Sequence, residues 1–369
     1  MTLRRMSSQD AAPVKMAWPR ARANNAPSSS SRTSKMISMV IVQGAGMARR
    51  RAIIQPMRTR HSGALQLGLA ALLIGWGLAA AELPVVWVLS TGGTIAGQGA
   101  TSTSLTQYKS GAIPGSALVK AVPEIARIAN IRVEQIANVD SSNITLEHWL
   151  TLANRVNRIF AEEPETAGVV ITHGTNTIEE TAYFLNLTVK YDRPVVLVGS
   201  MRPGTAVSAD GPLNLLNAVR TAIAPEARGK GVLVVLNDEI NAARDVTKTN
   251  TLRVETFRSP DFGFLGYVDG DKISFYRTPV KRHTTKSEFD VSALKELPAV
   301  EILYSYVQPG TVLIRALLAS GVKGIVMAGS GAGLVTTVEK DALAKAQGPV
   351  VVRSNRTGSG RVNATYFLS

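Results

Sequence analysis

The chain has 369 residues, 45% of them hydrophobic, and a formal net charge of +14. This length and apolar content allow a substantial buried core and about two domains, so an intrinsically disordered protein is excluded. The chain has no cysteine, which excludes disulfides, thiolate nucleophiles and cysteine-bound metals. Its four histidines show no metal-ligand spacing either, so we expect no metal site.

The positive charge lies almost entirely near the N-terminus. Residues 1–60 contain twelve Lys or Arg and one acid, Asp10, which accounts for +11 of the total and leaves the rest of the chain nearly neutral. A basic arm that binds nucleic acid or a membrane surface is the alternative for this segment. The segment lacks the interleaved aromatic residues that would support this alternative. We expect residues 1–56 to be a disordered leader or a mis-assigned start, and we expect no nucleic-acid partner.

A signal-peptide pattern follows at residues 57–81. Basic residues after Met57 precede the apolar run 64–78 and the small residues Ala79-Ala80-Ala81, which is the order typical of a secretory signal. The apolar run is shorter than the roughly 20 residues that span a bilayer. We therefore predict cleavage near Ala81 and a periplasmic or secreted mature protein without a membrane anchor.

From Glu82 onward, short Val/Leu/Ile-rich runs alternate with amphipathic segments, which is typical of an α/β fold with parallel strands. The predicted strands of the first unit are the continuous apolar runs 85–90, 169–172, 195–200 and 232–236. The segment Thr177-Ile178-Glu179-Glu180 predicts a capping box at the start of one helix. Asp210-Gly211-Pro212 predicts an acidic cap at the start of another helix.

A polar, charged stretch at residues 276–298 is interpreted as a surface linker. It separates a predicted N-terminal domain at 82–275 from a smaller C-terminal domain at 299–369. The smaller domain alternates predicted strands with predicted helices, in the order 300–307, 312–319, 325–328, 338–346 and 350–352. This β-α-β-α-β order predicts a small, flavodoxin-like α/β sheet.

Two of the predicted strands run into turns rich in glycine and threonine, at residues 90–97 and 172–177. Ligands of open α/β sheets bind at the carboxyl ends of the strands, so these turns are candidates for a site. The glycine spacing fits neither a dinucleotide nor a P-loop pattern. Threonine hydroxyls beside flexible glycines and free backbone N–H groups favour nucleophilic catalysis, with an ordinary structural turn as the alternative.

Lys248 lies in a third segment of interest, residues 244–250. A lysine that is partly desolvated beside Thr175 can be neutral for part of the time and act as the base that a threonine hydroxyl needs. A solvated surface lysine is the alternative.

Sequence blocks in these turns and beyond them occur in the order of a known family: STGGTIAG at 90–97, ITHGTNTIEETAYFLNLTV at 171–189, GSMRPGTAVSADGPLNLLNAV at 199–219, RDVTKTNT at 244–251 and GIVMAGSGAG at 324–333. On these blocks the chain resembles the bacterial type II (periplasmic) L-asparaginases and glutaminase-asparaginases. The resemblance implies hydrolysis of L-asparagine to L-aspartate and ammonia, with L-glutamine as a candidate side substrate. It also implies that no cofactor is used and that the protein is a homotetramer built from intimate dimers.

The resemblance further implies roles for individual residues. Thr94 matches the nucleophilic threonine, and Tyr108 matches its hydrogen-bonding partner. Thr175 and Lys248 match the second threonine and its lysine, which activate or position the attacking group. The implied substrate-binding residues, with Ser141 on the substrate α-carboxylate and Gln308 donated by a neighbouring subunit, are Ser141, Ser142, Asn176, Ser200 and Gln308.

Three departures from the family pattern also matter. The acid that usually follows the second threonine is Asn176 here, which implies weaker binding of the substrate ammonium, by about 1–3 kcal/mol, and better binding after Asn176→Asp. Ser142 replaces a Gln or Glu of the carboxylate pocket. The chain ends at Ser369 where family members continue, so we expect a truncated C-terminal domain without the acid that partners Thr94 and Tyr108. A catalytically silent amino-acid-binding homologue is therefore the alternative to an active enzyme.

Overall fold

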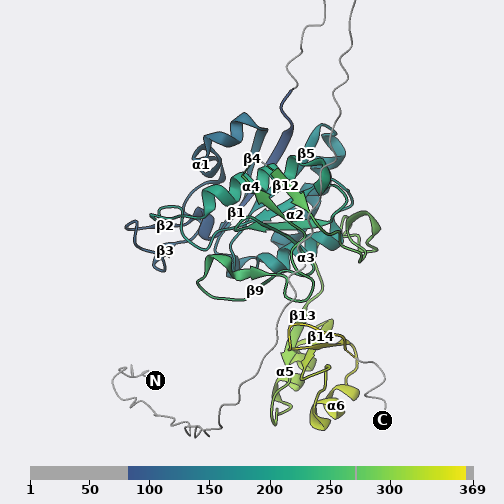
Figure 1. The fold of residues 1–369 in the computed structure, drawn as a ribbon. Coiled ribbons are helices and arrows are strands. Elements are labelled where there is room, and N and C mark those ends of the chain that lie inside the picture. The colour runs from purple at the N-terminus through teal and green to yellow at the C-terminus, as the bar shows by residue number, and fades with distance from the viewer. Residues whose placement is uncertain (1–81, 271, 363–369) are drawn as a thin grey trace, which may run out of the picture. The chain divides into compact units, whose positions relative to one another are not determined.

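The computed structural model describes residues 82–270 and 272–362 (Figure 1). The predicted leader at 1–56 and signal peptide at 57–81 lie outside the described residues. None of the helices in this described part has both the length and the apolar content needed to cross a bilayer.

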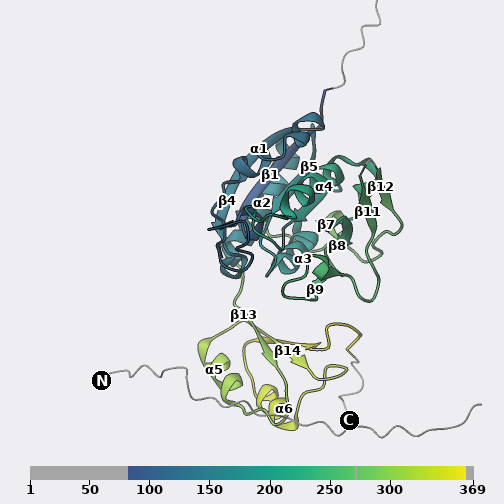
Figure 2. The same ribbon diagram turned by 60° about the vertical axis from the view of Figure 1, so that its left-hand side comes forward.

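A mixed, eight-stranded sheet forms the larger part of the fold, in the order β12-β11-β8-β7-β6-β5-β1-β4. Its parallel strands are β1 (Val85–Gly92), β4 (Asn130–Val139), β5 (Thr166–Thr172), β6 (Val195–Val198) and β7 (Val232–Leu236). The remaining strands, β8 (Glu239–Ala242), β11 (Gly266–Asp269) and β12 (Lys272–Phe275), are antiparallel and extend the sheet on the side opposite β4 (Figure 2). The strands predicted from the continuous apolar runs are confirmed, although β6 ends two residues earlier than expected.

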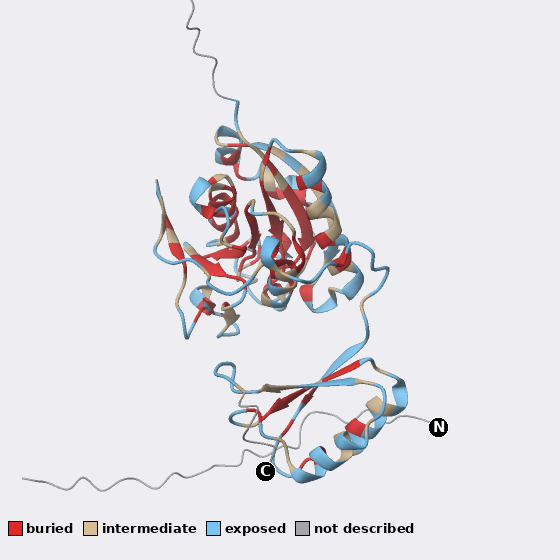
Figure 3. Ribbon diagram, turned by 90° about the vertical axis from the view of Figure 1, so that its right-hand side faces the viewer, coloured by how far each residue is buried: buried red, intermediate tan, exposed pale blue. Residues whose placement is uncertain are grey.

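Helices cover both faces of this sheet. On one face, α1 (Gly115–Lys120) and α4 (Gly211–Ile223) pack on a core that includes Val86, Val88 and Val170. On the other face, α2 (Leu146–Glu162) and α3 (Ile178–Thr188) pack on a second core that includes Leu89 and Ile171. Successive residues of a strand point to opposite faces, so a central parallel strand must be apolar at every position. The buried residues accordingly concentrate on the central strands (Figure 3).

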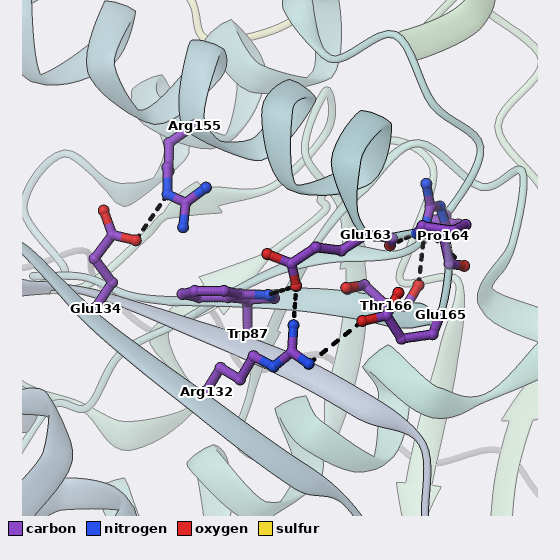
Figure 4. Close-up of polar contacts among 9 residues, drawn as sticks. Trp87, Arg132, Glu134, Arg155, Glu163, Pro164, Glu165 and Thr166 are labelled. Atoms are coloured by element: carbon purple, nitrogen blue, oxygen red, sulfur yellow. Dashed lines mark hydrogen bonds and ion pairs between the residues drawn. The ribbon is translucent and has the colours of Figure 1, made fainter.

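A polar cluster around Trp87 of β1 fixes the connection from α2 to β5 (Figure 4). The indole Nε1 of Trp87 donates to Glu163 Oε2 at 2.8 Å, and the same oxygen pairs with Arg132 of β4. Arg155 of α2 lies 4.6 Å from the Trp87 ring centroid and pairs with Glu134 at 2.7 Å. The cluster therefore ties α2, β4 and the turn before β5 to the central strand.

The predicted helix starts are confirmed, but both predicted side-chain caps are wrong. The Thr177 hydroxyl makes no cap and instead donates to the carbonyl oxygen of Ser141 at 2.7 Å. The Asp210 carboxylate accepts from the backbone N–H groups of Met201 and Arg202, each at 2.9 Å, rather than from a backbone N–H of its own helix. In both cases a partner from another loop replaces the local helix N–H.

The predicted surface linker at 276–298 is mostly exposed, but a few of its residues are fixed to the larger sheet. Its one helical turn is η6 (Thr284–Lys286), and Lys190 Nζ donates to the Ser287 carbonyl at 3.0 Å. Val291 is buried in the core beneath α2 and α3. This segment is thus anchored to the helical layer of the larger sheet.

A smaller parallel sheet follows, with the order β13-β14-β15. Its strands and helices are β13 (Val300–Tyr304), α5 (Val312–Ser320), β14 (Gly324–Gly329), α6 (Thr337–Ala344) and β15 (Val350–Asn355). Leu303, Ile314, Ile325 and Met327 form its core. The predicted β-α-β-α-β order is confirmed, while β13 ends three residues before the predicted end at residue 307.

Candidate active site

The strand order of the larger sheet reverses between β1 and β5, which is the point where open α/β sheets form a crevice. After β1 the chain continues to β4 on one side, and β5 then pairs with β1 on the other side. Loops leaving the carboxyl ends of two such strands diverge, which makes this point the usual ligand site of open α/β sheets. Thr94 follows β1 and Thr175 follows β5, so both predicted catalytic threonines lie at this crevice.

Two glycines allow the turns after β1 and β5 to touch. Gly93 has a φ of +80°, and a Cβ placed on it would lie 2.3 Å from the Cα of Gly174. A Cβ placed on Gly174 would lie 2.6 Å from Ser141 Oγ. Any side chain at either position would therefore force the turns apart. Their close packing brings the Thr94, Thr175 and Ser141 turns to one place.

Thr94 forms a hydrogen-bonded pair with Tyr108. Thr94 begins the 3₁₀ turn η1 (Thr94–Ala96), and its side chain is 7% exposed. Its Oγ1 lies 2.8 Å from the Tyr108 hydroxyl, and either oxygen can be the donor. Tyr108 belongs to β3 (Tyr108–Lys109), which pairs with β2 (Gln98–Gly99) in a hairpin directly after η1. This hairpin holds the phenol against the threonine.

Thr175 and Lys248 form the second pair. Lys248 Nζ donates to Thr175 Oγ1 at 2.9 Å. The lysine lies in β9 (Thr247–Lys248), which pairs with β10 (Phe257–Arg258). Glu179, in the first turn of α3, fixes β9 by accepting from the backbone N of Lys248 at 2.5 Å and from Thr247 Oγ1 at 3.1 Å.

The charge state of Lys248 is set by opposing effects. Burial lowers the pKa of its amine below the usual value, while the Glu179 and Asp140 carboxylates oppose this shift. A lowered pKa increases the neutral fraction of the amine, and only the neutral amine can accept a proton. The structure therefore places a candidate base in direct contact with the Thr175 hydroxyl.

The predicted substrate-binding residues near these pairs are joined by hydrogen bonds. The backbone N of Asn176 donates to Ser141 Oγ at 3.1 Å, and Ser141 is 2% exposed. The Asn176 carboxamide donates to Ser142 Oγ at 3.2 Å and accepts from Lys248 Nζ at 3.2 Å. Beside this network lies a cavity of about 300 Å³, which is lined by Asn176, Lys248, Thr249, Asn250 and Thr251.

The other two predicted binding residues are placed differently. Ser200 is completely buried, and its hydroxyl donates to the carbonyl oxygen of Arg202 at 2.6 Å, within its own turn. Gln308 is exposed in the loop after β13 and has a φ of 55°, in the left-handed region. The roles of both residues stay predictions.

Two family models match the chain. The one described as "Asparaginase, N-terminal" matches residues 85–281, and the one described as "Glutaminase/Asparaginase C-terminal domain" matches residues 299–368. The chain belongs to the asparaginase family. The resemblance seen in the sequence blocks is thereby confirmed at the level of the asparaginase family.

Individual members of the asparaginase family are similar over most of their length. "L-asparaginase 2" of Bacillus subtilis is 54% identical over 283 residues, which cover 76% of this chain and 75% of that protein. The "Probable L-asparaginase periplasmic" of Haemophilus influenzae is 50% identical over 283 residues, which cover 76% and 80%. A crystal structure described as a probable cytoplasmic L-asparaginase from Campylobacter jejuni is 52% identical, with a TM-score of 0.74 and coverage of 76% of this chain and 86% of that chain.

Sequence reasoning missed two carboxylates at this asparaginase-family site. Glu179 was interpreted only as part of a helix cap, yet it holds the β9 backbone next to Lys248. Asp140 precedes the predicted Ser141-Ser142 segment and caps the 3₁₀ turn η3 (Ser141–Asn143), since its Oδ1 accepts from the backbone N of Ser142 at 2.9 Å. An acid directly before two binding serines was the available signal. Within residues 82–270 and 272–362, no three His, Asp or Glu residues are grouped so as to hold a metal ion.

Proposed function

We propose that the chain is an L-asparaginase that hydrolyses L-asparagine to L-aspartate and ammonia, with L-glutamine as a side substrate. The observation that carries this proposal is the 2.9 Å contact between Lys248 Nζ and Thr175 Oγ1 beside the Thr94–Tyr108 pair. Relatives named L-asparaginase at about half identity support the same substrate.

In the proposed first step, Thr94 Oγ1 bonds to the carbon of the substrate side-chain amide. The C–N bond breaks, and the hydroxyl proton leaves with the ammonia. The Tyr108 hydroxyl, at 2.8 Å, orients the attacking oxygen and relays its proton.

In the proposed second step, water attacks the resulting ester carbon. Lys248 accepts the proton of this water through the Thr175 hydroxyl, and the ester C–O bond breaks. Lys248 returns this proton to the departing Thr94 oxygen, so that the amine is neutral again, Thr94 recovers its hydroxyl group and L-aspartate is released. Each step uses one threonine, which accounts for the presence of two at the crevice.

We also propose that the protein is exported and assembles as a homotetramer, with Gln308 completing the site of a neighbouring subunit. Export is supported by the signal pattern at residues 57–81 and by the Haemophilus influenzae relative that is described as periplasmic. The Campylobacter jejuni relative is described as cytoplasmic, so the family includes both locations. Cell fractionation and light scattering of the purified protein test the two proposals separately.

Ammonia release from L-asparagine by the purified full-length chain tests the proposed activity. Thr94→Ala should abolish turnover, since no other hydroxyl is proposed to form the ester. Thr103→Ala is the matched control, because Thr103 is an exposed threonine in the connection between β2 and β3. Wild-type turnover by Thr94→Ala would refute the assigned nucleophile. Binding of L-aspartate by the wild-type chain without any ammonia release would instead identify a silent binding protein.

A further inference from the structure

The residue that follows the second catalytic threonine of the site has a neutral side chain. Asn176 follows the second catalytic threonine, and its carboxamide has no charge to attract the α-ammonium group of an amino-acid substrate. An ammonium without a carboxylate partner binds weakly, because hydrogen bonds between charged groups are about twice as strong as neutral ones. A functional site therefore needs a negative charge close to this position.

The Asp140 carboxylate lies on the far side of the Asn176 carboxamide. Asn176 Oδ1 accepts from Lys248 Nζ at 3.2 Å, and its Nδ2 donates to Asp140 Oδ1 at 3.4 Å. Asn176 thus bridges the lysine and the acid. We propose that Asp140 binds the α-ammonium group of the substrate, in the role that the family assigns to an acid at position 176. This inference rests on the proposed amidohydrolase function.

Asp140 is suited to this role because its negative charge is stabilised. Burial by itself would raise the pKa of the Asp140 carboxyl, but the hydrogen bonds from Ser142, Ser110 and Asn176 together outweigh burial and lower it. Asp140 is also partly exposed, so a ligand can reach it. The hydrogen bonds from the backbone N of Ser142 and from Asn176 Nδ2 both go to Asp140 Oδ1, at 2.9 and 3.4 Å.

The position of Asp140 also explains why residue 176 is an amide. An aspartate at 176 would place two carboxylates within hydrogen-bonding distance, and one of them would then take up a proton. Asn176 avoids this repulsion and donates a hydrogen bond to Asp140 instead. On this proposal, Asn176→Asp by itself does not improve asparagine binding, in contrast to the expectation from sequence. It improves asparagine binding only when Asp140 is neutralised at the same time.

The test compares kcat/KM for L-asparagine with kcat/KM for succinamate, which has the same amide and carboxylate but no α-ammonium. Asp140→Asn keeps an oxygen that can accept from the Ser142 N–H and removes only the charge. The ratio of the two constants should fall about 10- to 100-fold in this variant. Asn176→Asp alone should not raise the ratio. The double variant Asp140→Asn/Asn176→Asp should return the ratio to within about threefold of the wild type, a rescue that a merely structural role of Asp140 would not produce.

Two results would overturn the proposal. One is an equal loss on both substrates in Asp140→Asn, which would mean that the residue acts on the fold or on Lys248. The other is a higher ratio in Asn176→Asp alone than in the wild type, which would place the ammonium beside residue 176.

Calorimetric titration of the full chain with L-aspartate and with succinate repeats the comparison without turnover, because these ligands differ only in the ammonium. Absence of ammonia release by the wild type would refute the proposed function. An unchanged aspartate-to-succinate preference in Asp140→Asn would refute this inference independently.

Discussion

His173 gives the protein a specific sensitivity to acid. The residue is completely buried between β5 and the Thr175 turn, and its Nδ1 lies 2.8 Å from the carbonyl oxygen of Gly174. Its Nε2 lies 3.0 Å from Thr181 Oγ1, which also accepts from Trp149 Nε1 at 2.8 Å. Since a carbonyl oxygen can only accept, the neutral imidazole carries its proton on Nδ1, and the Thr181 hydroxyl donates to Nε2. Burial lowers the pKa of His173 to about 4.

The sign and size of the effect follow from this pKa. An unfolded histidine has a pKa of 6.5, so below that pH the unfolded chain binds a proton that the folded protein does not take up until about pH 4. Stability is therefore lost as the pH falls from 6.5 to about 4. Since each pH unit contributes about 1.4 kcal/mol, the full loss is about 3 kcal/mol.

Urea unfolding of the full chain, at fixed protein concentration between about pH 7 and pH 4, measures this loss. His173→Asn removes the titrating ring and keeps a donor for the Gly174 carbonyl. Its unfolding free energy should fall about 3 kcal/mol less than that of the wild type over this range. Val170→Ala, a buried and non-titrating change in β5 just before His173, should lower stability without altering the pH dependence. Parallel pH profiles for wild type and His173→Asn would refute the reasoning.

Lys248, Tyr108 and Glu163 give further predictions. Wild-type kcat should rise toward alkaline pH, because burial lowers the pKa of Lys248 and the neutral amine is the base. Lys248→Met should reduce turnover by about 10²–10⁴-fold with an unchanged circular dichroism spectrum. Tyr108→Phe should lower kcat by about 10²-fold and leave KM nearly unchanged, since the lost hydroxyl contacts Thr94; an equal rise in KM would argue against this role. Glu163→Gln should keep full activity and lower thermal stability by less than about 1 kcal/mol, because its pair with Arg132 is partly exposed.

Four of the five parallel strands of the larger sheet could be predicted from sequence because they are buried on both faces, whereas the edge strand β4 was missed because all its residues are exposed or only half-buried. A strand such as β7 must then be apolar at every position, and its predicted ends agree with the structure. The antiparallel strands β8, β11 and β12 were missed. Each has four residues, too few for a clear alternating pattern, and β8 follows a tight turn at Asn237 and Asp238 with φ values of 51° and 63°.

The wrong caps have a common physical cause. A capping signature counts only partners within one helix turn, whereas Thr177 and Asp210 have partners from other loops that the folded chain brings closer. Thr177 connects its helix to Ser141, and Asp210 holds the turn that contains Met201. Both residues thus serve the loops around the crevice. Local patterns are least reliable at such positions, because tertiary contacts there compete with the local hydrogen bond.

The candidate site shows the same limit in its electrostatics. Comparison with a family pattern treats each position separately, so the neutral Asn176 counts as a lost charge. The energy of an electrostatic interaction depends on the distance between the charged groups in space and not on their positions in the sequence. Asp140 is 36 residues from Asn176 in sequence but 3.4 Å from its Nδ2 in the fold. On the proposed assignment, the negative charge that binds the ammonium is carried by Asp140, the hydrogen-bond partner of residue 176. The identity of residue 176 alone therefore does not decide whether the site is silent.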